Sequence, residues 1–149
     1  MKRALYLSQA SVSFTDEELE DLAVYSAFNN RQKDVTGYLC FSRNTFFQFL
    51  EGDDKTVDGL LHTIRNDARH TFINQIESRD NNERLFSSWS MKYLSYNDLS
   101  TISLENYVVD NMLYLKSGLS DKQRCLRLLW NQIRLISLLH DSQMMLERT

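Results

Sequence analysis

The sequence predicts an α+β fold in which two helices cover one face of a five-stranded sheet. Three observations lead to this prediction. Two amphipathic stretches with helical periodicity are separated by runs rich in Val, Tyr, Phe and Thr. A hairpin signal lies in the first half of the chain, at 34–52. The resulting order, β-α-β-β-α-β with one added strand, is that of a ferredoxin-like sandwich, and two further helices are expected after it.

The first strand is predicted around Tyr6, where side chains alternate between the two faces. Thr15 opens a capping box, so a helix is expected to begin at about Asp16. The inward stripe of this helix reaches Asn29 and Asn30 at its C-terminus. Asparagine also favours the left-handed position that ends many helices, so either residue could simply be a cap. This alternative is weaker for Asn30, because one helix end needs only one such residue.

The hairpin at 34–52 consists of two predicted strands around the break at 42–44. Its second strand, 46–50, has bulky apolar residues on both faces, so it is expected inside a covered sheet. Gln48 then lies among buried side chains. A buried amide must find partners for its donors and its acceptor, or it costs about 1–3 kcal/mol. Gln48 therefore predicts a polar partner elsewhere in the chain.

A second helix is predicted after the hairpin, capped by Asp53 or Asp54. Its core face consists of four aliphatic residues at helical spacing, Val57, Leu60, Leu61 and Ile64. Arg65 flanks this stripe and could lean over the sheet or point into water. For a single arginine the solvated position is the commoner one.

Two more strands are predicted at 72–77 and 89–94. On the second of these strands Trp89 and Met91 share one face. Filling of the core would by itself explain such a pair.

The predicted topology brings several polar side chains together between the two helices. If Tyr6, Gln48 and Met91 lie on the helix-facing side of neighbouring strands, they meet Asn30 and Arg65 there. No His, Asp or Cys is placed with them, so hydrolysis and nucleophilic catalysis have no evident residue to carry them, and no metal site is expected. The group suits a planar heterocycle that takes hydrogen bonds along one edge and apolar contacts on its faces.

Composition narrows the classes of function. The net charge is −3 and the 17 Lys and Arg residues are scattered, so nucleic acid is not an expected ligand. There is no apolar run long enough for a membrane span and no signal-peptide pattern, which predicts a soluble cytoplasmic protein. Cys40 and Cys125 lie in apolar contexts and are interpreted as reduced core thiols.

From about Lys2 to Leu94 the chain resembles the BLUF domain, a flavin-binding blue-light sensor module. The resemblance rests on short motifs that occur in order along the chain: Tyr6, Asn29-Asn30, Val35-Thr36-Gly37, Phe47-Gln48-x-Leu50-Glu51-Gly52, Arg65, Asp67-x-Arg69-His70 and Trp89-Ser90-Met91. Tyr38 follows the Thr-Gly pair where an aliphatic residue is more usual, and this departure concerns local packing.

The resemblance implies a flavin cofactor between the two helices, with FAD expected ahead of FMN or riboflavin. Asn30 and Arg65 would hold the ring, with Asn29 as a second polar contact. Gln48 would lie between Tyr6 and the flavin. In this family light drives electron and proton transfer from the tyrosine, the glutamine rearranges or tautomerises, and the flavin spectrum shifts to longer wavelength. No substrate is converted, so the protein is expected not to be an enzyme.

The same resemblance gives Trp89 and Met91 a role in transmitting the signal. In the family the strand that carries them senses the rearranged glutamine, and the residue that faces the flavin depends on conformational state. The sequence leaves open which of the two does so here.

The chain is predicted to divide into a flavin-binding domain at 1–96 and a helical extension at 97–149. The last helix, which opens with a capping box at Ser120, is apolar around most of its circumference. One side is expected to cover the open sheet face and another to meet a second subunit or a partner. The alternative is a helix that is fully buried within one chain.

The expected function is that of a short BLUF photoreceptor whose output is a light-dependent change in protein contacts, with a homo-oligomer formed through the C-terminal helices. Two alternatives belong to other classes. One is a flavin-dependent redox enzyme that uses the same pocket, and the other is a ferredoxin-like interaction module without a cofactor.

Overall fold

The computed structural model describes residues 1–79, 81–86 and 90–94, together with 131, 134 and 138. The chain divides into two compact units, Met1–Tyr96 and Asn97–Thr149. In the second unit the three described residues are helical and exposed. The remainder of the two predicted C-terminal helices, including Cys125, lies outside the described residues.

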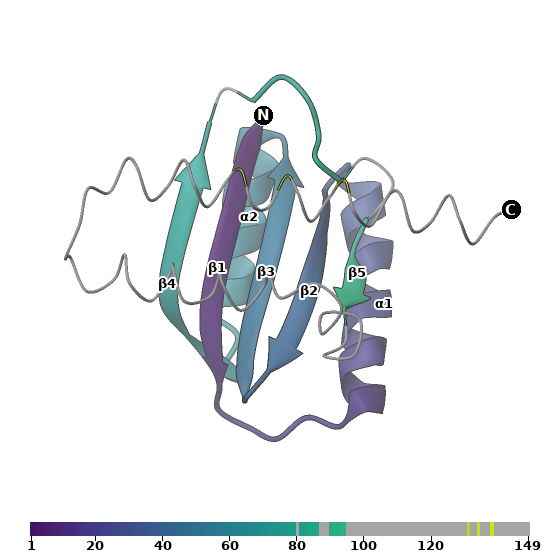
Figure 1. Ribbon diagram of the computed structural model, residues 1–149, viewed down its shortest axis with the longest axis vertical. Helices are drawn as coiled ribbons and strands as arrows, with labels where there is room; N and C mark the ends of the chain where they lie inside the picture. The colour runs from purple at the N-terminus through teal and green to yellow at the C-terminus, as the bar shows by residue number, and fades with distance from the viewer. Residues whose placement is uncertain (80, 87–89, 95–130, 132–133, 135–137, 139–149) are drawn as a thin grey trace, which may run out of the picture. The chain divides into compact units, whose positions relative to one another are not determined.

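The first unit is an α+β sandwich (Figure 1). Its elements are β1 (Lys2–Ala10), α1 (Asp16–Gln32), β2 (Thr36–Ser42), β3 (Thr45–Gly52), α2 (Asp54–Arg65), β4 (His70–Ser78) and β5 (Lys92–Leu94). The strand order is β4-β1-β3-β2-β5, with antiparallel neighbours except for the parallel pair β2 and β5. Figure 1 shows α1 and α2 on the same face of the sheet. The predicted α+β fold with two helices on one face is thus confirmed.

Strand lengths differ from the prediction at the end of this unit. The strand predicted at 72–77 begins earlier, at His70, and ends at Ser78. The strand predicted at 89–94 is described only over 92–94, where it pairs with β2. Met91 therefore lies immediately before β5 and not inside it.

The capping residues in the sequence correctly predicted where the two helices begin. Thr15 caps α1 through its hydroxyl, which accepts from the Glu18 amide at 3.2 Å, and the Glu18 carboxylate accepts from the Thr15 amide at 2.7 Å. Asp53, not Asp54, caps α2 by accepting from the Thr56 amide at 3.2 Å. The left-handed residue after α1 is Asp34, with φ of 52°, so neither Asn29 nor Asn30 serves as the αL cap.

The hairpin between β2 and β3 is tight. Ser42 pairs with Thr45, and the two turn residues Arg43 and Asn44 have φ of 51° and 61°. Positive φ at both positions is the pattern of a type I′ turn, whose twist suits antiparallel strands. This turn fixes the register of β3, and β3 in turn places Gln48 opposite Tyr6 on β1.

The two faces of the sheet carry separate apolar clusters. On the helix face, Tyr6, Leu39 and Leu50 pack in a core with residues of both helices. On the opposite face, Tyr38 is fully buried, stacks on Phe49 and meets Phe86 edge-on at 4.9 Å between ring centroids. A large aromatic ring at position 38 is therefore accommodated by aromatic neighbours.

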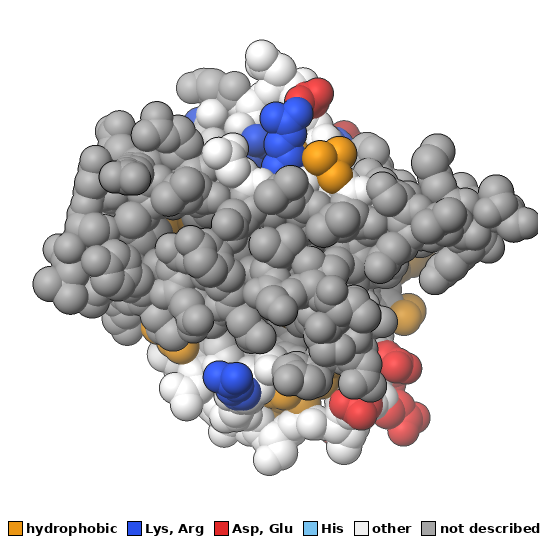
Figure 2. Space-filling model, in the orientation of Figure 1, with side chains coloured by type: hydrophobic (Ala, Val, Ile, Leu, Met, Phe, Trp, Pro, Cys, Tyr) orange, Lys and Arg blue, Asp and Glu red, His pale blue; other side chains and the backbone are white. Residues whose placement is uncertain are grey.

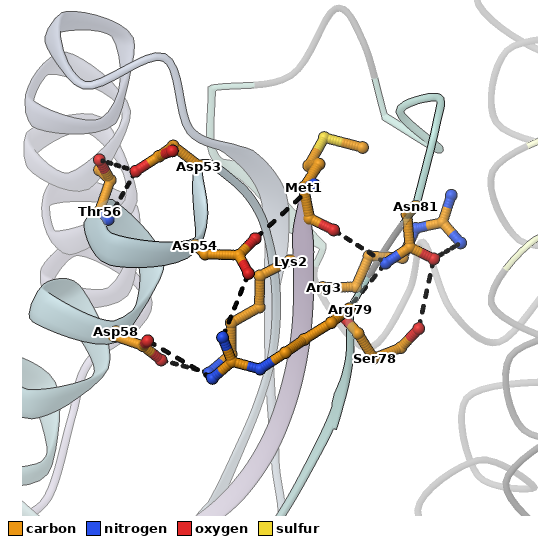
Figure 3. Close-up of polar contacts among 10 residues, drawn as sticks. All are labelled: Met1, Lys2, Arg3, Asp53, Asp54, Thr56, Asp58, Ser78, Arg79 and Asn81. Carbon is orange, nitrogen blue, oxygen red and sulfur yellow. Dashed lines mark hydrogen bonds and ion pairs between the residues drawn. The ribbon is translucent and has the colours of Figure 1, made fainter.

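Charged groups join β1, α2 and β4 at the N-terminus of the chain (Figure 3). The buried Lys2 ammonium pairs with Asp58 on α2 and with Glu77 on β4, the latter at 2.7 Å. Arg79 pairs with Asp54 at 3.1 Å and with Asp58. Burial by itself lowers the pKa of Lys2, but its hydrogen bonds to the two carboxylates outweigh this effect and raise it. Lys2 thus stays charged and holds α2 against the edge of the sheet.

Candidate functional site

A pocket of about 390 Å³ opens between α1, α2 and the sheet. Its polar lining includes Tyr6, Asn29, Asn30 and Gln48, which are four of the predicted site residues. Its apolar lining comes from both helices and from β2 and β3: Leu22, Leu39, Phe46, Leu60 and Ile64. The pocket combines a small group of convergent polar atoms with apolar walls, which is the usual composition of a small-molecule site.

A chain of three side chains runs through the wall of this pocket. Tyr6 on β1 donates its hydroxyl hydrogen bond to Gln48 Oε1 on β3, and both residues are almost completely buried. Gln48 Nε2 in turn donates to the Met91 sulfur at 3.4 Å. The Gln48 amide thus has a strong partner on its oxygen and a weak one on its nitrogen. Gln48, predicted to need a partner, has found one in Tyr6.

Tyr6 is surrounded by aromatic rings and lacks access to water. Phe72 on β4 stacks on it with ring centroids 4.4 Å apart, and the His70 ring lies 6.2 Å away. Burial raises the pKa of Tyr6 far above its usual range, and the carboxylate of Asp67 raises this pKa further. The phenol is therefore neutral at every physiological pH and acts as a hydrogen-bond donor.

The two asparagines at the end of α1 differ in their surroundings. Asn30 is buried, and its Nδ2 donates to the Ser90 carbonyl at 3.0 Å, just before Met91. Its backbone carbonyl accepts from the Val35 amide at 2.9 Å and so ends the helix. Asn29 is half-buried and also lines the pocket. Both residues therefore line the pocket, and Asn30 also joins α1 to the connection that leads into β5.

Arg65 is not among the residues that line the pocket. Its side chain is exposed, and its guanidinium donates to Gln75 Oε1 on β4 and lies 5.0 Å from the centre of the Phe72 ring. As the last residue of α2, Arg65 lies beside the edge strand β4, which offers both a hydrogen-bond acceptor and an aromatic face. In the structure Arg65 therefore does not converge with Gln48, because its guanidinium contacts Gln75 and Phe72 on β4.

The turn between α2 and β4 supplies pocket residues to which the sequence had given no role. Asp67, Arg69 and His70 all line the pocket. Arg69 is paired with Asp67 through its Nε at 3.0 Å and its Nη2, and this pair lowers the pKa of Asp67 to about 2. The Asp-x-Arg-His motif marks these positions in the sequence. It does not predict where their side chains point, because that depends on where α2 ends.

His70 links this turn to the first strand. Its Nε2 lies 2.8 Å from the Ile64 carbonyl, which can only accept, so Nε2 carries the hydrogen. Its Nδ1 then accepts from the Ser8 hydroxyl at 2.7 Å in the neutral ring. His70 thereby fixes the end of α2 against β1 beside Tyr6.

Met91 is buried against Gln48, while Trp89, the other predicted transmitter, lies outside the described residues. Among the described residues no group of three or more His, Cys, Asp or Glu is arranged to hold a metal ion. Within the same part of the chain no helix is both long and apolar enough to cross a membrane. On the face shown in Figure 2, the visible described Lys and Arg side chains form separate small groups, and acidic side chains are also present.

The sequence matches the family BLUF, described as sensors of blue light using FAD, over residues 1–92. Among curated relatives, it is 32% identical over 94 residues to the photoactivated adenylate cyclase subunit alpha of Euglena gracilis. It is 28% identical over 103 residues to the subunit beta of Euglena longa. These alignments cover 62% and 68% of this chain but only 9% and 12% of the two relatives. The chain thus spans about a tenth of their length.

Solved structures show the same fold. A bacterial light-regulated adenylyl cyclase aligns with 31% identity and a TM-score of 0.64, over 78% of this chain and 35% of that one. The photo-activated state of BlsA aligns with 26% identity and a TM-score of 0.63, over 89% and 94% of the two chains. The dark state of BlrB, a BLUF protein, has 20% identity and a TM-score of 0.65 over 90% and 95%, which is a likeness of fold alone.

Proposed function

This chain belongs to the BLUF family of flavin-binding blue-light sensors, and on that basis we propose that it is a photoreceptor switched by the hydrogen bonds of Gln48. The observation that carries the proposal is the contact chain from Tyr6 through Gln48 to Met91 in the wall of the pocket. Tyr6 is on β1, Gln48 is on β3 and Met91 immediately precedes β5. A change at the Gln48 amide therefore affects three separate segments of the chain.

The residues of the pocket fit a flavin ring. The volume of about 390 Å³ lies in the range of small-molecule sites, and Leu39 and Ile64 offer apolar contacts for a planar ring. Asn29, Asn30 and Gln48 present amide donors and acceptors to the same space. We assign the binding of the ring to these amides, with Tyr6 beside them. We keep Arg65 as a predicted contact of the ring, which its guanidinium would make by leaving Gln75.

A bound flavin supplies the absorption of blue light and the acceptance of an electron from a nearby donor. Tyr6 is the donor proposed here, because its ring lines the pocket and its proton already points at an acceptor. A neutral phenol that loses an electron becomes a strong acid, so its proton moves along the existing hydrogen bond toward Gln48 Oε1. The protein thus holds the proton of Tyr6 on a defined path.

Gln48 is suited to act as the switch because its amide can be satisfied in two arrangements. In the arrangement described, the oxygen faces Tyr6 and the nitrogen faces Met91. Rotation or tautomerisation of the amide exchanges a donor for an acceptor at each end. The pocket therefore receives a different set of hydrogen bonds while the packing around Gln48 is preserved.

We further propose that Met91 passes this change to β5. The Met91 sulfur loses its donor when the amide reverses, and an unbranched thioether repacks at small cost. Ser90, the preceding residue, is held by Asn30, so the connection before β5 contacts two residues of the pocket. Trp89 stays a predicted second transmitter.

The proposed output is a light-dependent change in contacts with a protein partner or a second copy of the chain. The relatives described as cyclases couple light to an enzyme. For this chain we propose a signalling role without catalysis, in which the helical extension at 97–149 provides the oligomer contact. If the protein with bound flavin steadily oxidised a reductant, this result would instead favour the flavin-dependent redox enzyme.

Two substitutions test the switch. Tyr6→Phe and Gln48→Leu should each retain flavin but lose the light-induced shift of its absorption band to longer wavelength. Matched controls are Tyr38→Phe, which removes a buried hydroxyl on the opposite face of the sheet, and Gln75→Leu, which removes a half-buried amide on β4. Both controls should keep the shift. A normal photocycle in Tyr6→Phe or Gln48→Leu would refute the proposal.

A further inference from the structure

Glu51 is a fully buried carboxylate that the proposed switch does not use. It lies on β3 three residues after Gln48, so the two side chains are on opposite faces of the sheet. Its oxygens accept from the backbone amides of Phe86 at 2.7 Å and Leu85 at 3.0 Å, and from the Thr36 hydroxyl at 3.2 Å. Among the residues that the structure describes, the cation paired with Glu51 is Arg3, whose Nε lies 3.6 Å from Glu51 Oε2.

A buried charge is tolerated only when it is paired and hydrogen-bonded. At Glu51 two of the three hydrogen-bond donors are backbone amides of the connection between β4 and β5. The carboxylate therefore does more than satisfy its own charge. It fixes one point of that connection to the middle of the sheet.

Two neighbours strengthen this attachment. Arg84 donates to the Asp34 carbonyl at 2.7 Å and to the Thr36 hydroxyl at 2.9 Å, both near the start of β2. Phe86 is buried against the rings of Tyr38 and Phe49. The segment 84–86 is thus held by backbone bonds, by a guanidinium and by an aromatic side chain.

The same connection meets the switch a few residues later, on the other face of the sheet. Ser90 is bound by Asn30, and Met91 receives the hydrogen bond of Gln48. Met91 follows Phe86 by only five positions. The connection is therefore attached away from the pocket, with Glu51 holding the segment nearest to Met91, and again at the pocket, through Met91 itself.

We infer that Glu51 is a positioning residue for signal transmission. It holds segment 84–86 in place, so that a rearrangement at Gln48 displaces Met91 and β5 instead of the whole connection. This inference rests on the proposed function, and it assigns to Glu51 a part in coupling while leaving the photochemistry to Tyr6 and Gln48.

The test is Glu51→Gln, which keeps the size of the side chain but leaves one oxygen to serve two backbone amides. In the dark, amide hydrogen exchange at Leu85, Phe86 and Tyr93, followed by NMR, should be about tenfold faster, as expected for a lost buried hydrogen bond. Exchange at Tyr6 and Gln48 should stay unchanged. Under blue light the absorption shift should persist. The light-induced change in exchange at Tyr93 should fall at least about twofold, because the connection before β5 is no longer held at segment 84–86.

Glu83→Gln is the matched control. It makes the same chemical change in the same connection, at an exposed side chain, and should behave as the unmodified protein does. If Glu51→Gln does not fold, Arg84→Gln removes the outer part of the attachment and should show the same pattern in weaker form.

The inference is overturned if exchange at Leu85 and Tyr93 is unchanged in the folded variant, or if the light-induced change at Tyr93 stays at full size. Failure of the proposed function would look different. The unmodified protein would then show no absorption shift, while the exchange rates in the dark would still decide whether Glu51 anchors the connection.

Discussion

At the scale of single residues, the Gln48 amide has two unequal partners. Its oxygen accepts from a buried phenol, whereas its nitrogen donates to a thioether, which is a weak acceptor. Little is therefore lost on the nitrogen side when the amide turns, and Tyr6 can either donate or accept. In the proposed switch Met91 senses the turn, because its sulfur is the atom whose partner would change from a donor to an acceptor.

The contribution of the sulfur can be measured with Met91→Leu and Met91→Ala. Both variants should keep the flavin absorption shift, because Tyr6 and Gln48 are intact. The light-induced change in amide exchange at Tyr93 should be reduced in both, and more strongly in Met91→Ala, where the cavity also removes packing against Gln48. If both variants keep the full change at Tyr93, Met91 is not the transmitter.

A second prediction at this scale concerns Asp67 and acid. Its pKa is lowered from 3.8 to about 2, chiefly by the hydrogen bond from Arg69. A lowered pKa contributes stability that is present above pH 3.8 and is lost as the pH falls through about 2. After allowance for solvent screening of this partly exposed pair, we expect about 1 kcal/mol.

The measurement for Asp67 is urea unfolding of the unmodified protein and of Asp67→Asn between pH 5 and pH 2. The stability difference between the two proteins should shrink by about 1 kcal/mol over this range. Arg69→Gln should reproduce the effect, since it removes the same pair. A constant difference between pH 5 and pH 2 would contradict this account of Asp67.

At the scale of helices and strands, the sheet brings distant segments to one site through close backbone contacts. Gly37 on β2 has φ of 155°, and a Cβ there would lie 1.9 Å from the Phe49 carbonyl oxygen. This contact lets β2 approach β3 beside the pair of Gln48 and Leu39. The Val-Thr-Gly motif therefore has a structural reason: only glycine permits this approach.

Gly37→Ala should destabilise the protein by about 2–4 kcal/mol, since backbone atoms must move to admit the methyl group. The matched control is Gly59→Ala on α2, where no atom lies within 4 Å of the added Cβ. That variant should instead be more stable by about 0.5–1 kcal/mol, because alanine favours the helix. Chemical denaturation of both variants checks the prediction, and an equal effect at the two glycines would contradict it.

The sequence predicted an element well where the interacting residues lie close together in the sequence, and poorly where they meet only in the folded sheet. The start of α1 and the hairpin turn depend on residues close in sequence, so the capping box and the turn residues located them. Tyr6 and Gln48 were correctly placed together, because alternation along two neighbouring strands fixes their face. The contacts of Arg65 with Gln75 and Phe72 could not be predicted, because these residues meet only in the folded sheet, and its contact with a flavin stays a prediction. Glu51 belonged to one of the quoted motifs but received no role, since two of its partners are backbone amides that the sequence does not reveal.

At the scale of the whole molecule, the connection from β4 to β5 links the two faces of the sheet. Segment 84–86 is attached on the face of Tyr38 and Phe49, and Met91 contacts the face that carries the pocket. A local change at the pocket thus has a route to the edge strand β5, which precedes the second unit in the chain. This arrangement suits a sensor whose output is made by a neighbouring element.

The predicted oligomer contact of the C-terminal extension can be tested directly. Leu126→Asp and Trp130→Asp should each lower the molar mass measured by size-exclusion chromatography with light scattering, because a charge would enter an apolar interface. Asn131→Asp is the control, since it places the same charge at an exposed helical position. Unchanged mass in both test variants would favour a last helix that is buried within one chain.

The central claim, that the Gln48 amide changes its hydrogen bonds in light, is tested most directly by infrared difference spectroscopy. Protein labelled with ¹³C at the glutamine side-chain carbonyl would be compared, light minus dark, with unlabelled protein. The account predicts a difference band in the amide carbonyl region that moves with the label in the unmodified protein and in Gln75→Leu. A flavin absorption shift without any label-sensitive band would contradict the account.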